Sequence, residues 1–412
     1  MRRFGLSALV LALLGCQHTD APLVDAGLAD ASDAAPSDAW SAPRIDGGHD
    51  AGPVPTDLEG FIGYQMSLGH LPGVATAIID HGTVVHMTAQ GMATDTTSVD
   101  PHTLFLVASI SKTFVAALML GLVEEGTVSL DEPAETYLGY PVRSPMSPDH
   151  AITVRELMTH TSGMVDDWFA LGQVTVTGDP TTTLEQFSSG YVPQDLHYTT
   201  ASGTSFDYCN AGFGVLGAIV EAAGHEDLRM RTARTLTGPL ALDGAGWWLA
   251  DVDQSRLAIE YSSMQTGGVW HFIANPQRGF GHYTATSMRI SITGLSRWVL
   301  AHTLNGTLDG VTFLSQASID EERRVQFPSV AGGQGLVWYY RNLAGSRWLS
   351  HSGSSFGASS DILYREDGRG LVVMTNSDAY IRERLGQTDG SGAIEAILAR
   401  LNQEADTLAA AP

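Results

Sequence analysis

The chain has 412 residues, of which 43% are hydrophobic, and its formal net charge at pH 7 is −23. This apolar content, together with 45 glycines, is typical of a well-packed globular enzyme with many turns. The excess of acidic residues argues against nucleic acid as a partner, because the chain offers no basic stripe that could bind phosphates.

The first segment of the chain has the pattern of an export signal. A short basic start precedes an apolar run that ends at Leu14, and this run is too short to span a bilayer. The ending Leu-Leu-Gly-Cys resembles the cleavage box of bacterial lipoproteins, which implies that residues 1–15 are removed and that Cys16 carries a lipid. Gln17 behind it implies an anchor at the periplasmic face of the outer membrane of a Gram-negative bacterium. An ordinary secretory signal with a chance cysteine is the alternative.

Residues 16–57 have the composition of a disordered tether. Ala, Asp, Pro, Ser and Gly dominate, and the few apolar side chains follow neither a helical nor a strand period. Such a segment cannot bury enough surface to offset the entropy cost of ordering it. A calcium site on its aspartates is disfavoured, because no loop has the ligand spacing and the glycine of a calcium-binding loop. We expect neither a metal nor another cofactor in this protein.

Residues 58–405 have the size of one domain with an inserted subdomain. Apolar runs at 73–80 and 83–88 are separated by a two-residue turn, which predicts a hairpin. Two further strands are predicted at 360–364 and 370–374, near the other end of the chain. Strands at both ends with helices between them predict an α+β fold. In this fold a single antiparallel sheet, whose two ends meet, is flanked by helices and carries a mainly helical inserted subdomain.

Three helices are predicted, and the first of them begins at a candidate catalytic serine. One helix is expected from Ser109 to Glu125, where the apolar spacing is helical and Gly126 provides a stop. A second helix is expected to end at Gly224, and a closing helix over residues 392–405. Ser109 therefore lies at the start of a helix, where the positive end of the helix dipole acts on neighbouring groups.

Lys112 is the only lysine in the chain, and it lies three residues after Ser109. Arginine keeps its proton near neutral pH, whereas a partly buried lysine can have its pKa lowered and act as a base. Positions i and i+3 lie on one face of a helix, so the amine is expected beside the Ser109 hydroxyl. The pair predicts a serine nucleophile activated by a lysine. Because serine is common, a chance pairing is the alternative.

Two further clusters are weak signals when each is taken alone. Tyr208-Cys209-Asn210 stands before an apolar helix, and His351-Ser352-Gly353 stands in a turn-rich stretch. In the order Ser-x-x-Lys, Tyr-x-Asn, His-x-Gly, however, the motifs resemble the serine β-lactamase-related superfamily. Class C β-lactamases, D-Ala-D-Ala carboxypeptidases and β-lactamase-like esterases belong to it.

The resemblance covers essentially all of residues 58–400. The stretch at 157–163 matches the family's Leu-Leu-x-His-Thr-Ser-Gly, with Met for the second Leu, and the segment from Leu130 matches its Leu-Asp-Asp-Pro. Residues 335–338 match its Gly-Leu-Gly-Trp strand. The resemblance implies a core sheet flanked by helices, with the active site at the border with the helical subdomain.

The resemblance also implies the catalytic roles. Ser109 would attack a carbonyl and become acylated. Lys112 is the candidate base, and Tyr208 would share or relay the proton; both remain candidates for the base of the acylation step. Asn210 would hold the substrate amide and the amine of Lys112.

The strand side of the site is expected to bind the substrate. His351 would line the site opposite Tyr208, followed by Gly353 and Ser354. The backbone N–H groups of Ser109 and Ser354 would form the oxyanion hole.

Two departures from the family pattern limit the prediction. His351 replaces the lysine of the β-lactamase Lys-Thr-Gly motif, so the fixed charge for a substrate carboxylate is missing and β-lactam turnover is in doubt. Arg289 could reach the site as a substitute. Cys209, where Ser or Ala is usual, is interpreted as a packing residue. For His160 a structural role in loop packing is favoured.

Three functions follow from these residues. The first is a lipid-anchored serine acyl-hydrolase that acts on D-amino-acid peptides, such as a peptidoglycan stem peptide, or on β-lactams. The second is a carboxylesterase on the same fold. The third is a catalytically silent peptidoglycan-binding or scaffold lipoprotein, against which the intact Ser109, Lys112, Tyr208 and Asn210 argue.

Overall fold

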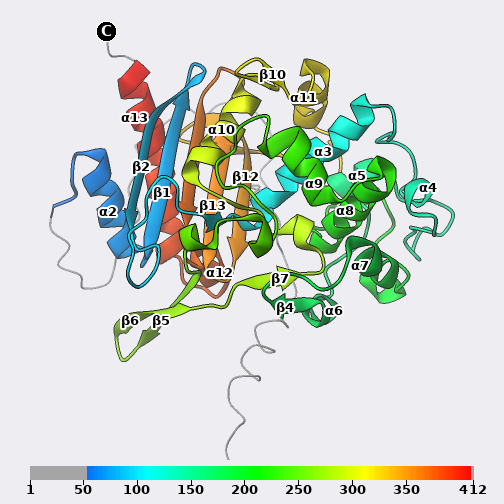
Figure 1. Cartoon of the computed structure of the whole chain (residues 1–412), viewed down its shortest axis with the longest axis horizontal. Coiled ribbons are helices and arrows are strands. Elements are labelled where there is room, and N and C mark those ends of the chain that lie inside the picture. The colour runs from blue at the N-terminus through cyan, green and yellow to red at the C-terminus, as the bar shows by residue number, and fades with distance from the viewer. Residues whose placement is uncertain (1–52, 410–412) are drawn as a thin grey trace, which may run out of the picture.

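A six-stranded sheet in the order β11-β12-β13-β14-β1-β2 forms the centre of the molecule (Figure 1). All neighbouring strands are antiparallel, with the bounds β1 Gly73–Asp80, β2 Thr83–Gly91, β11 Tyr339–Leu343, β12 Ser346–Ser355, β13 Ala358–Tyr364 and β14 Gly370–Thr375. The computed structural model describes residues 53–409. The expected signal segment, Cys16 and most of the tether lie outside the described residues.

The two ends of the chain meet in this sheet, as predicted. β1 pairs with β14 from Val74↔Thr375 to Ile79↔Gly370. The predicted hairpin is formed by β1 and β2, and its turn places Gly82 at a φ of +83°. Because β1 and β14 occupy the middle of the sheet, all their residues are buried, and their sequences read as continuous apolar runs.

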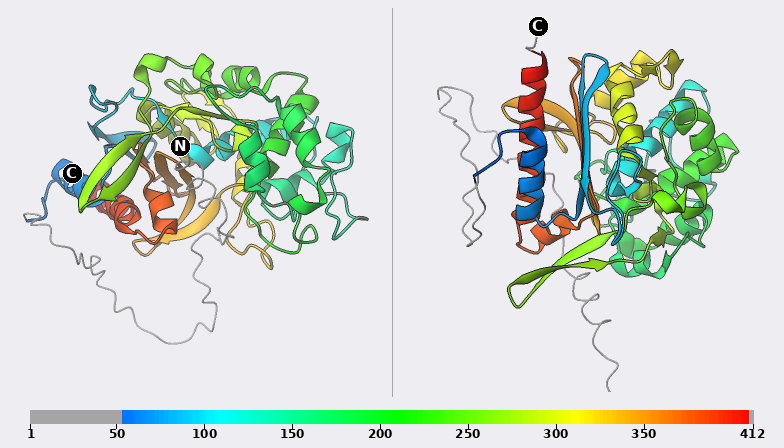
Figure 2. Two further views of the ribbon diagram at one scale, coloured as in Figure 1. Left: turned by 90° about the horizontal axis from the view of Figure 1, so that it is seen from below. Right: turned by 60° about the vertical axis from the view of Figure 1, so that its left-hand side comes forward.

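Helices cover both faces of the sheet (Figure 2). On one face lie α2 (Leu58–Leu68) and α13 (Asp389–Ala409), which pack against each other. α13 also contacts β1 and β14, and α2 contacts β2. On the other face lies α10 (Ile292–Thr303), which contacts β1, β2, β13 and β14. Each face therefore has its own apolar core, and the larger one continues into the helical region.

The helical region is inserted between β2 and β11. Its helices are α3 Ser111–Glu124, α4 Glu135–Leu138, α5 Val154–Met158, α6 Trp168–Gln173, α7 Leu184–Tyr191, α8 Asn210–Gly224 and α9 Leu228–Thr232. The central helix α8 packs against α3, α5 and α7. Gly214 lets α7 approach closely, because a Cβ at this position would overlap with the ring of Phe187. The prediction of an α+β fold with a mainly helical insertion is confirmed.

Short elements complete the fold. They are the two-stranded pairs β3 Phe105–Leu106 with β8 Arg289–Ile290, β4 Thr175–Thr177 with β7 Arg278–Phe280, β5 Tyr261–Thr266 with β6 Val269–Ala274, and β9 Thr307–Leu308 with β10 Val311–Thr312, and the helices α11 Gln316–Arg323 and α12 Ala379–Arg384. The β5–β6 hairpin projects from the body of the molecule (Figures 1 and 2). Among residues 53–409, no helix has both the length and the apolar character that crossing a membrane requires.

Three predicted elements differ from the structure. Ser109 lies in a 3₁₀ turn, η1 (Ala108–Ile110), and the α-helix begins only at Ser111, because Ala108 adopts a left-handed φ of +47°. The closing helix α13 is longer than predicted at both ends. Residues 335–338 are no strand but an irregular segment before β11, in which Val337 has a φ of +70°. A β-branched residue is strained there, where the family has glycine.

Candidate active site

The turn that carries Ser109 is held between β12 and the segment before β8. The backbone N–H of Val107 donates to Met288 O at 3.0 Å, and Ser360 Oγ donates to Val107 O at 3.1 Å. Gly353 on β12 lies directly against the same carbonyl, since a Cβ at this position would overlap with Val107 O. This contact brings the His-x-Gly strand to the side of the Ser-x-x-Lys turn, and it explains why the position after Ser352 is a glycine.

Lys112 is fully buried, and three oxygen atoms surround its amine. Nζ lies 2.9 Å from Ser109 Oγ, 2.8 Å from Asn210 Oδ1 and 2.9 Å from the carbonyl oxygen of Ala285. A neutral amine has two N–H groups and one lone pair. Asn210 Oδ1 and Ala285 O can only accept, so they take the two N–H groups and leave the lone pair for a hydroxyl group. The hydroxyl of Ser109 is in place to donate to it.

Tyr208 lies beside the amine and is fixed by His160. The Lys112 Nζ atom is 4.8 Å from the centre of the Tyr208 ring. This ring stacks on the imidazole of His160 at 4.3 Å, and His160 Nδ1 accepts the backbone N–H of Cys209 at 3.1 Å. Burial and the charge of Lys112 lower the pKa of His160 well below its ordinary value, so the ring is neutral. His160 therefore packs and orients the Tyr-x-Asn loop.

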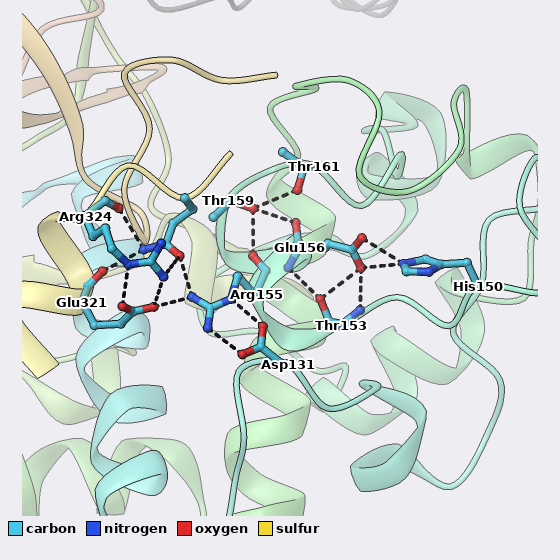
Figure 3. A network of polar contacts seen from close by, with 10 residues as sticks. Asp131, His150, Thr153, Arg155, Glu156, Thr159, Thr161, Glu321 and Arg324 are labelled. Atoms are coloured by element: carbon cyan, nitrogen blue, oxygen red, sulfur yellow. Dashed lines mark hydrogen bonds and ion pairs between the residues drawn. The ribbon is translucent and has the colours of Figure 1, made fainter. Parts of the chain in front are cut away.

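A polar network anchors the segment that carries His160 (Figure 3). Arg155 on α5 binds both oxygens of Asp131, at 2.7 and 2.8 Å, and also pairs with Glu321 on α11. Thr159 Oγ1 donates to the carbonyl oxygen of Arg155 at 2.8 Å. The network links the Leu-Asp-Glu-Pro segment at 130–133 to α5 and α11. This segment, which resembles the family pattern, therefore helps to hold the loop at 159–163 in place.

Asn210 is held on its far side by Asp166, a residue that was not among the predicted site residues. Asn210 Nδ2 donates to Asp166 Oδ2 at 2.6 Å, and the backbone N–H of Ala211 donates to Asp166 Oδ1 at 2.9 Å. Burial raises the pKa of Asp166, while these hydrogen bonds and the charge of Lys112 oppose the rise. In the sequence it is an isolated acidic residue, and no local pattern marks it as part of the site.

His351 lies on β12 as a buried, neutral side chain. Its Nδ1 is 2.9 Å from the carbonyl oxygen of Ser352. Burial, followed by the charge of Lys112, lowers the pKa of His351 to about 3. At pH 7 this imidazole carries no charge, and its place on β12 gives the site no fixed cation.

The edge of β12 beyond His351 presents backbone N–H groups away from β13. The N–H of Ser352 donates to Tyr339 Oη at 3.0 Å and so points to the outer edge. Because backbone direction alternates along a strand, the N–H of Ser354 points to the same edge. Arg384, on α12, donates from Nη2 to Ser354 Oγ at 2.5 Å. This arginine was not predicted as a site residue, because it lies 30 residues further along the chain and outside every motif.

Arg289 and Cys209 have structural roles and do not line a substrate site. The guanidinium of Arg289 is buried and binds Gln277 Oε1 at 2.9 and 3.1 Å, and it also donates to the carbonyl oxygens of Trp247 and Ser287. Since these groups take up its donors, the idea that Arg289 replaces the missing charge is wrong. The buried thiol of Cys209 accepts the N–H of Gly212 at 3.3 Å and so caps α8.

A serine in contact with a buried lysine, next to a tyrosine and an asparagine, is an arrangement in which the serine can act as a nucleophile. The comparison with known families identifies the family of the chain. Residues 58–390 match the Beta-lactamase family, and the chain belongs to this family.

The relatives are distant. The chain is 26% identical to penicillin-binding protein 4 of Amycolatopsis lactamdurans over 78% of this chain and 87% of that protein. It is 21% identical to Protein flp of Staphylococcus aureus over 77% of this chain, but it spans only 62% of the length of that relative. Among solved structures, the D-amino acid amidase of Ochrobactrum anthropi SV3 is similar in fold. It has a TM-score of 0.67 and 20% identity, over 86% of this chain and 98% of that one.

Proposed function

We propose that the protein hydrolyses amide bonds next to D-amino acids in small peptides, in the manner of a D-Ala-D-Ala carboxypeptidase. The observation that carries the proposal is the buried amine of Lys112, 2.9 Å from Ser109 Oγ with two acceptor oxygens behind it. Ser109 Oγ attacks the scissile carbonyl carbon, and its proton passes to Lys112 or Tyr208. The amine leaves with a proton, and water then hydrolyses the ester on Ser109.

The strand edge supports a substrate that carries a carboxylate. Arg384 has an exposed side chain that contacts Ser354, so a positive charge stands beside the proposed oxyanion donor. One of the solved structures with a similar fold is a D-amino acid amidase, which agrees with this class of substrate.

A carboxylesterase is the second candidate, and the state of His351 favours it. With a pKa lowered to about 3, this side chain offers no fixed charge to a substrate carboxylate, and an ester substrate needs none. We further propose that the lipid on Cys16 tethers the enzyme on the periplasmic side of the outer membrane, where stem peptides of peptidoglycan are within reach.

The intact mass of the protein, followed over time with benzylpenicillin, tests the proposal. Ser109→Ala is the control, and we expect it to lower turnover of every substrate by about 10⁴- to 10⁶-fold. A persistent adduct that requires Ser109 supports the peptidase, together with release of D-Ala from a D-Ala-D-Ala peptide. Hydrolysed drug without an adduct would indicate a β-lactamase.

Two further results would overturn the peptidase. Intact drug and intact peptide, together with turnover of a p-nitrophenyl ester, would indicate the carboxylesterase. Inertness toward all three compounds would indicate a silent scaffold.

A further inference from the structure

Asp166 is a carboxylate next to the site that none of the proposed chemical steps uses. It accepts hydrogen bonds from the side chain of Asn210 and from the first turn of α8. Asn210 in turn contacts the amine of Lys112 through its amide oxygen. The carboxylate is therefore linked to the amine by hydrogen bonds that pass through a single amide group.

The backbone on both sides of Asp166 is clamped. Tyr191 Oη donates to the carbonyl oxygen of Val165 at 2.7 Å and accepts the N–H of Asp167 at 2.7 Å. The N–H of Val165 donates to His197 O at 2.9 Å, and the rings of Tyr191 and His197 stack at 3.8 Å. Because its neighbours are held in this way, the Asp166 carboxylate has a fixed place against α8.

The carboxylate decides which way the amide of Asn210 faces. An ionised carboxylate only accepts hydrogen bonds, so the NH₂ group of Asn210 must face Asp166. The amide oxygen then faces Lys112 Nζ, at 2.8 Å. With the amide reversed, an NH₂ group would meet the amine, and one of the two acceptors that orient the amine would be lost.

We propose that Asp166 is a positioning residue for the acyl transfer. It fixes the amide of Asn210, and through that amide it directs the lone pair of Lys112 toward the hydroxyl of Ser109. The inference rests on the proposed roles of Ser109 and Lys112. It applies equally to amide, ester and β-lactam substrates, because it concerns the nucleophile alone.

The test measures the nucleophile directly. The rate constant for labelling of Ser109 by a fluorophosphonate is determined between pH 5 and 10 for the unaltered protein and for Asp166→Asn. The new amide can donate where a carboxylate only accepts, so Asn210 is released to turn. We expect the plateau of the rate to fall about 10- to 100-fold, as is typical when a supporting residue is lost. Removal of a negative charge near Lys112 should also move the acid limb of the profile to lower pH.

Two variants make the result specific. Asp149→Asn is the control, because it removes the same charge from an exposed carboxylate of the helical region that takes no part in holding Asp166. We expect its labelling rate and pH profile to be unchanged. If thermal unfolding shows that Asp166→Asn does not fold, the labelling rate is measured on Asp166→Ala instead.

The outcomes separate the two proposals. A folded Asp166 variant with an unchanged plateau, or with a lower plateau and an unmoved acid limb, would overturn the positioning role. If Ser109→Ala is still labelled at the original rate, the proposed nucleophile is wrong, whatever the Asp166 variants do.

Discussion

The two sides of the site are built differently. On the helical side, the buried Lys112 and Asn210 and the half-buried Asp166 form a chain of short hydrogen bonds in which each donor has a defined acceptor. On the strand side, His351 is neutral and the charge near the site comes from Arg384, an exposed side chain on α12. In the proposed mechanism the helical side fixes the geometry of the nucleophile, whereas on the strand side only a few side chains are available to bind the substrate.

The difference has a physical cause. A buried amine is stable only where its hydrogen bonds are satisfied, so a change in one partner affects the others. An exposed guanidinium is solvated, and its interaction with a ligand is screened and modest. Substitutions on the helical side should therefore lower the rate strongly, while those on the strand side should alter the choice of substrate.

Lys112→Arg should have the largest effect, because it changes the group at the centre of the helical side. A guanidinium keeps its proton at every accessible pH and cannot serve as a base. We expect kcat to fall about 10²- to 10⁴-fold for amide and ester substrates alike, which steady-state kinetics would measure. A variant that retains most of its activity would remove Lys112 as the base and leave Tyr208.

His351→Lys tests the strand side of the site, where we expect a change in substrate binding. An ammonium group on β12 supplies the charge that the imidazole lacks. We expect KM for a peptide with a free terminal carboxylate to fall about fivefold, on the scale of a partly screened ion pair. The same peptide with an amidated terminus is the control. Equal KM values in both proteins would mean that position 351 does not face the substrate.

Arg384→Ala tests the cation that lies at the strand edge. We expect KM for the carboxylate peptide to rise about two- to fivefold with little change in kcat, because the interaction is exposed. Arg347→Ala removes the same charge from the other end of β12 and should leave KM unchanged. If both variants behave alike, the effect comes from net charge and not from a specific contact.

His351→Asn should act on stability in acid, because it removes a side chain that is buried without charge. The pKa of His351 is about 3 in the folded protein and about 6.5 when unfolded, so the unfolded chain binds the extra proton. The folded state therefore loses about 1.4 kcal/mol per pH unit as the pH falls from about 6.5 to 3. Denaturant unfolding between pH 7 and 4 should show a smaller loss for the variant. The same change at the exposed His81 is the control, and an equal loss in all three proteins would contradict the expectation.

Much of this arrangement followed from local spacing in the sequence. Ser109 and Lys112 were predicted to be neighbours because three residues make about one helical turn, and the contact is 2.9 Å even though a 3₁₀ turn carries the serine. The strands were predicted from apolar runs and turn residues, and the sheet closes through β1 and β14 as expected. The export signal, the lipid on Cys16 and the boundaries at 15/16 and 57/58 stay predictions.

Contacts between distant segments were decided only by the tertiary structure. Asn210 and Ala285, which accept hydrogen bonds from Lys112, lie 98 and 173 residues away from it. Asp166 and Arg384 were missed because an isolated acidic or basic residue has no local pattern that separates a site residue from a solvated one. The same holds for Arg289, because the sequence does not show that its guanidinium is hydrogen-bonded to Gln277. Helix and strand geometry fixes which residues share a face, but only the packing of those faces decides which side chains meet.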